Sequence, residues 1–151
     1  MFKRQVLLEC ISALLILLFL YTSLSKFMDF KSFVDDMNNQ PFPNSWTPFL
    51  VWFVPCSEIL ICIALLFERT RMAGFIGSLV LMTLFTIYTI IVLLNFFTYI
   101  PCSCGGVIRR LTWNQHLVFN LFFVALSITG LILQHRKYFK SILITQTNSF
   151  V

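Results

Sequence analysis

Two cysteines that can undergo thiol–disulfide exchange lie close together in Pro101-Cys102-Ser103-Cys104-Gly105-Gly106. A disulfide between Cys102 and Cys104 would close a very small, strained ring, and strained disulfides are readily reduced. This favours a pair that exchanges electrons with another dithiol. A structural bond and a metal site are the alternatives, but only His116 is available as a further ligand, so we expect no metal.

Cys56 and Glu58 are the next candidates. Pro55 can kink a helix just before Cys56 and bring that thiol within reach of Cys102 or Cys104; a small buried cysteine is the alternative. Glu58 lies inside an apolar run, where the burial of a carboxylate is costly enough to suggest function. We expect Glu58 to face the protein interior as a proton acceptor for a thiol or as a polar anchor. A simple hydrogen bond to a polar neighbour is the alternative.

A third group of candidates opens the last apolar run. His116 and Asn120 are four residues apart and therefore share one helix face, next to the cysteine segment. His116 can stabilise a thiolate or exchange protons with a membrane quinone, and Trp113 can line a slot for the quinone ring. An interfacial aromatic belt with a polar helix start is the alternative.

The elements that must position these residues are membrane helices. Of the 151 residues, 58% are hydrophobic and 11% are charged, which excludes an ordinary soluble domain. The net charge of +5 comes from scattered basic residues, not from the basic patch of a nucleic-acid-binding protein. Four apolar runs near the roughly 20 residues of a membrane span cover residues 6–24, 49–67, 72–97 and 114–133. They predict an all-α integral membrane protein, a four-transmembrane-helix bundle forming one domain over residues 1–140, with a short tail at 141–151.

The basic residues between the runs predict the orientation. Seven lie on one side, and four (Lys26, Lys31, Arg109 and Arg110) lie on the other. The positive-inside rule then places both termini in the cytoplasm and the cysteine segment outside. We expect a short surface helix and an extended approach within residues 25–48, and we interpret Cys10 and Cys62 as packing residues toward the cytoplasmic side.

Three segments carry a family resemblance. They are Tyr21-Thr22-Ser23-Leu24-Ser25-Lys26-Phe27, Pro55-Cys56-Ser57-Glu58 and Cys102-Ser103-Cys104-Gly105. With them the chain resembles the MauE/DoxX group of redox-associated membrane proteins over most of residues 7–133, and its MauE branch above all. The resemblance implies four helices and an association with methylamine utilisation and periplasmic disulfide formation. The family pattern Cys-Gly-Cys-Phe-Gly differs from the Cys-Ser-Cys-Gly-Gly present here, so a general thiol–disulfide role carries over better than the methylamine substrate.

We therefore predict a thiol–disulfide electron-transfer protein of the bacterial inner membrane. In this hypothesis Cys102 and Cys104 exchange with a periplasmic, thioredoxin-like partner, and electrons move to or from a membrane quinone. The alternative is a non-enzymatic scaffold or assembly subunit of a larger complex, with the cysteine segment as a structural cap. A change in the oxidation state of Cys102 and Cys104 with the applied redox potential would favour the first hypothesis.

Overall fold

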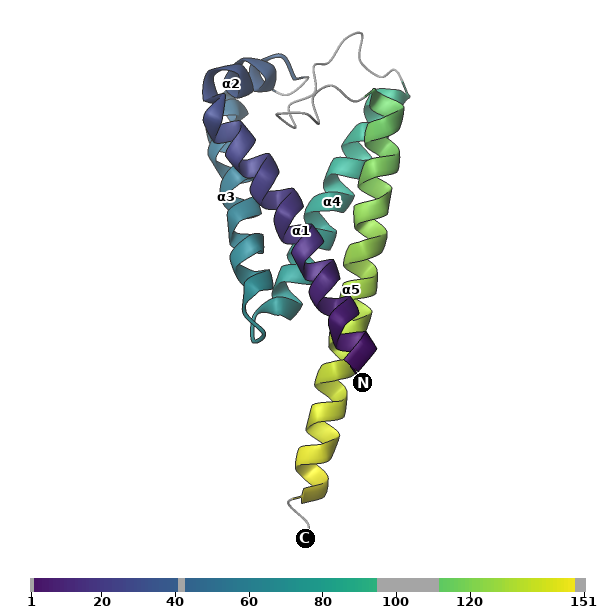
Figure 1. Cartoon of the computed structure of the whole chain (residues 1–151). Coiled ribbons are helices and arrows are strands. Elements are labelled where there is room, and N and C mark those ends of the chain that lie inside the picture. The colour runs from purple at the N-terminus through teal and green to yellow at the C-terminus, as the bar shows by residue number, and fades with distance from the viewer. Residues whose placement is uncertain (1, 41–42, 95–111, 149–151) are drawn as a thin grey trace.

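The computed structural model is a helical bundle that describes residues 2–40, 43–94 and 112–148, with side chains up to residue 137 (Figure 1). The long helices are α1 (Phe2–Met28), α3 (Thr47–Leu66), α4 (Arg71–Leu93) and α5 (Trp113–Asn148). A short helix, α2 (Phe30–Asn38), and a 3-10 turn (Asn44–Trp46) connect α1 to α3. Within these described ranges there is no strand, and four helices are long and apolar enough to span a membrane. The predicted fold class is confirmed.

Two helices are longer than the predicted runs. α1 continues past Leu24 to Met28, so Lys26 belongs to the helix and not to the connection in which the topology count placed it. α5 continues to Asn148, so residues 141–148, predicted as part of a tail, are helical. This stretch contains no proline or glycine that would end a helix. Residues 95–97 of the third predicted run lie outside the described residues.

The helices alternate in direction, and both chain termini lie at the end of the bundle opposite α2 (Figure 1). α2 confirms the predicted surface helix and packs Phe33 and Met37 against Val51 of α3. The predicted extended approach is wrong for Asn44–Trp46, because this segment closes a 3-10 turn with Trp46 N–H donating to the Pro43 carbonyl at 2.9 Å.

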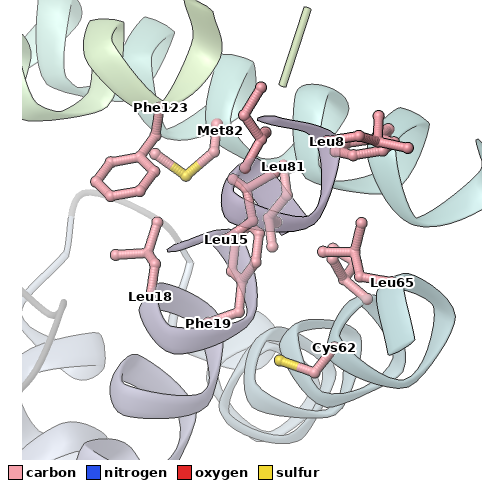
Figure 2. Packing of buried hydrophobic residues seen from close by; sticks show 12 residues of the cluster. Leu8, Leu15, Leu18, Phe19, Cys62, Leu65, Leu81, Met82 and Phe123 are labelled. Carbon is pink, nitrogen blue, oxygen red and sulfur yellow. The ribbon is translucent and has the colours of Figure 1, made fainter. Parts of the chain in front are cut away.

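The core lies around α1, which packs against both α3 and α5. Figure 2 shows Leu15 and Phe19 of α1 between Cys62 of α3 and Phe123 of α5. The packing interpretation is therefore confirmed for Cys62, which is buried. It is wrong for Cys10, which is exposed because it lies on the face of α1 turned away from this core.

α3 and α4 approach closely at one end and separate at the other (Figure 1). Near their connecting turn at residues 67–70 the contact is made by glycines. A Cβ atom on Gly74 would lie 2.8 Å from Leu65 Cγ, and one on Gly77 would lie 3.1 Å from Ile61 Cγ1. Small residues of this kind allow membrane helices to pack backbone to backbone. Toward α2 the two helices diverge, which leaves space between them.

α4 and α5 remain in contact along their length through small and polar groups. Ser78 Oγ donates to Ser127 Oγ at 3.0 Å, and Asn120 Nδ2 donates to Thr89 Oγ1 at 3.2 Å. Such bonds hold helices together where lipid provides no hydrophobic driving force. Gly130 completes the interface, because its bare backbone lies against the Phe75 ring.

We predict that Gly130→Ala destabilises the protein by about 1–3 kcal/mol, because the added methyl group overpacks the contact with Phe75. Thermal unfolding in detergent, followed by tryptophan fluorescence, measures the effect. The cost should shrink when Gly130→Ala is combined with Phe75→Leu, and the control Thr129→Ala, at an exposed site, should change little. Equal unfolding temperatures for wild type and Gly130→Ala would contradict the close contact.

Candidate functional site

A cavity of about 450 Å³ lies between the diverging halves of α3 and α4. Its volume is within the roughly 300–1,000 Å³ of small-molecule sites. Most of its wall is apolar, and includes Phe19 of α1, Phe53 of α3 and Phe85 of α4. Polar side chains also reach it from all four long helices and from Gln40. They are Thr22, Lys26, Gln40, Glu58, Tyr88, Thr89, His116 and Asn120.

The strongest polar contact at the cavity is a buried ion pair. Lys26 Nζ lies 2.7 Å from Glu58 Oε1, and the two side chains are 4% and 1% exposed. Lys26 Nζ also donates to the Thr22 carbonyl at 3.5 Å. Two opposite charges with hydrogen bonds can exist at this depth, whereas either charge alone would be costly in hydrocarbon. The expected inward orientation of Glu58 is confirmed.

The ion pair joins α1 to α3 together with a second hydrogen bond. Ser23 Oγ donates to the Pro55 carbonyl at 3.3 Å. Ser23 and Lys26 are three residues apart on α1, and Pro55 and Glu58 are three apart on α3. Each pair therefore shares a helix face. Two of the three segments that carry the family resemblance thus meet face to face.

One oxygen of Glu58 remains available. Glu58 Oε2 is buried and has no hydrogen-bond partner among the described residues. The Thr22 hydroxyl is near the carboxylate, but it donates to the Phe19 carbonyl at 3.1 Å, and a hydroxyl has only one proton to donate. Among the described residues, the cavity wall therefore contains an acceptor without a donor.

The three residues predicted to bind a quinone line the opposite part of the same cavity. His116 is 2% exposed, and its ring centroid lies 6.0 Å from that of Trp113. Asn120 is held by its bond to Thr89, and the Tyr88 hydroxyl donates to the Gln40 side chain. The alternative of an interfacial belt is wrong for His116 and Asn120, because both are buried inside the bundle.

The cysteine candidates are not part of this cavity wall as described. Cys56 lies on the exposed side of α3 and forms no disulfide with another described residue. It is two residues from Glu58 and so about 200° away around the helix. Cys102 and Cys104 lie outside the described residues, so their pairing with each other or with Cys56 stays a prediction.

Lys26 is the site residue that sequence reasoning missed. The apolar run ends at Leu24, which led to a loop assignment for Lys26. One signal for the pair was available: Lys26 lies just past one apolar run and Glu58 lies inside the next. Consecutive spans run antiparallel and can pack side by side, which allows two such charges to pair. The sequence did not suggest that the two residues pair, because they lie at different distances from their helix ends. Glu58 is eleven residues from the start of α3, whereas Lys26 is two residues from the end of α1.

A model of the methylamine utilisation protein MauE matches residues 4–133. The chain belongs to the MauE family. The MauE match includes every residue that lines the cavity and ends within α5. No curated protein and no solved structure matches the chain. As a MauE family member with four apolar helices among its described residues, it is a multi-pass membrane protein.

We predict that Lys26→Met lowers stability by about 3–5 kcal/mol, because it leaves the buried Glu58 without its partner. The double variant Lys26→Met/Glu58→Leu should recover most of this loss, since it removes both charges. Unfolding in detergent compares the variants. Lys137→Met is the matched control, because its pair with Glu68 is exposed and should contribute less than about 1 kcal/mol. A double variant as unstable as the single one would contradict the assigned role of the pair.

Proposed function

We propose that this MauE family protein carries electrons between a periplasmic dithiol protein and a membrane quinone. The observation that carries the proposal is the cavity, whose mostly apolar wall includes Glu58, His116, Trp113 and Asn120. A quinone needs such a site, because it has an apolar ring and tail with a polar oxygen at each end of the ring.

The shape and chemistry of the cavity fit this ligand. Phe53 of α3 and Leu84 of α4 line it and are 52% and 57% exposed, so the rim reaches the surface of the bundle. Both residues belong to candidate membrane spans, and a lipid tail can therefore leave the cavity into the bilayer. Glu58 Oε2, which has no donor among the described residues, offers a contact for a polar head group. When bound, a quinone supplies an acceptor for two electrons and two protons.

The cysteines provide the thiol chemistry in this proposal. A thiolate of the partner attacks the Cys102–Cys104 disulfide and forms a mixed disulfide. The partner's second thiol then attacks this mixed disulfide and completes the exchange. This oxidises the partner and leaves two thiols on Cys102 and Cys104. Those thiols then lose two electrons and two protons as their disulfide closes again, with Cys56 as the candidate relay. His116 exchanges protons at the cavity wall.

The arrangement of the chain supports placing the two chemistries near each other. The chain leaves the described structure at Leu94 and returns at Thr112, both at the α2 end of the bundle, where the cavity lies (Figure 1). We propose that this end faces the periplasm in the bacterial inner membrane. When the two buried and ion-paired residues Lys26 and Arg71 are both left out, the basic residues at the two ends number six against three, which supports the positive-inside argument.

A labelling experiment tests the orientation. In a Cys10→Ser/Cys56→Ser/Cys62→Ser background, a membrane-impermeant thiol reagent should label Cys102 and Cys104 in intact, reduced cells. A matched variant that also carries Cys102→Ser, Cys104→Ser and Glu68→Cys places its only thiol in the exposed α3–α4 turn. It should be labelled only after permeabilisation. The reverse pattern would overturn the proposed orientation.

Quinol formation tests the activity. In lipid nanodiscs with a reduced thioredoxin-like protein and a quinone, Cys102→Ser and Cys104→Ser should abolish electron transfer while the protein stays folded. His116→Leu should slow it at least about tenfold through the loss of proton exchange. Cys10→Ser is the control and should retain the wild-type rate. Full activity in the Cys102 and Cys104 variants, or their loss from the membrane, would favour the scaffold alternative.

A further inference from the structure

Glu58 Oε2, which has no donor among the described residues, can distinguish the oxidised from the reduced form of a bound quinone. We propose that the cavity binds a hydroquinone more tightly than the corresponding quinone, because only the hydroquinone brings an O–H donor to Glu58 Oε2. This inference rests on the proposed quinone site and adds to it a direction of electron flow.

The geometry of the ion pair leaves Glu58 Oε2 as the contact to be filled. Oε1 is occupied by Lys26 Nζ at 2.7 Å. The ammonium itself is surrounded by Glu58, by the Thr22 carbonyl at 3.5 Å and by the Phe33 ring, whose centroid is 5.9 Å away. Oε2 has no partner among the described residues although its side chain is only 1% exposed. A ligand that brings a donor to this oxygen adds a hydrogen bond that no described side chain makes.

The two ligand forms differ at the atom that would meet this oxygen. A hydroquinone presents an O–H group, and a hydrogen bond from it to a carboxylate is charge-assisted and strong. A quinone presents a carbonyl oxygen, which is only an acceptor and faces Glu58 Oε2 with a like partial charge. The apolar walls contact the ring of either form equally. The difference in affinity therefore arises at Glu58, and we expect it to be about tenfold or more.

Preferential binding of the reduced form changes the potential of the bound couple. For a two-electron couple, a tenfold preference raises the potential by about 30 mV. A bound quinone of raised potential is a stronger oxidant of thiols. By raising the potential of the bound quinone, the Lys26–Glu58 pair favours electron transfer from Cys102 and Cys104 to the quinone.

Binding of decylubiquinone and decylubiquinol to the purified protein in nanodiscs tests the inference, with quenching of tryptophan fluorescence as the readout. We expect the wild type to bind decylubiquinol at least about tenfold more tightly. Lys26→Gln/Glu58→Gln removes both charges together and supplies an amide that can donate or accept, so the two affinities should become equal within about twofold. The control Leu84→Ala alters only the apolar wall and should weaken both forms while keeping their ratio.

A potentiometric titration of wild-type protein loaded with decylubiquinone gives a second test that needs no variant. The midpoint should lie about 30 mV or more above that of the same quinone in empty nanodiscs. Equal affinities for the two forms, an unshifted midpoint, or a preference that survives in the double variant would overturn the inference and leave the proposed quinone site in place. Failure of both forms to bind would overturn the proposed function and the inference together.

Discussion

The buried ion pair between Lys26 and Glu58 is the contact on which the α2 end of the bundle depends. Either charge alone would be costly in hydrocarbon, which favours the register of α1 and α3 that joins them. In this register the last turn of α1 lies beside the first turns of α3, with the ring centroids of Phe27 and Trp52 6.3 Å apart. α2 covers the same end of the bundle by packing Phe33 and Met37 against Val51.

The same arrangement explains how so small a protein keeps an internal cavity. α3 and α4 are drawn together by Gly74 and Gly77 at their turn and diverge toward α2. Hydrogen bonds between α4 and α5 hold the far wall in place, including the one from Asn120 to Thr89. A cavity with apolar walls and polar side chains from every long helix has the lining that is typical of small-molecule sites.

Membership of the MauE family and the geometry of the cavity support different parts of the functional argument. The family match accounts for a membrane protein connected with methylamine utilisation. The cavity supports the proposed quinone site through its apolar walls, its polar side chains and its exposed rim at Phe53 and Leu84. Together they are the basis on which we propose quinone-linked thiol oxidation.

The sequence by itself determined the four spans and three buried polar candidates, Glu58, His116 and Asn120. Both conclusions follow from local signals, since continuous hydrophobicity predicts a span and a polar side chain inside one stands out. Only the tertiary structure showed Lys26 as the partner of Glu58, placed the candidates around one cavity and turned Cys56 away from it. These features depend on the register of α1 against α3 and on the rotation of each helix about its axis. Packing between distant segments sets both, and no local pattern of residues encodes it.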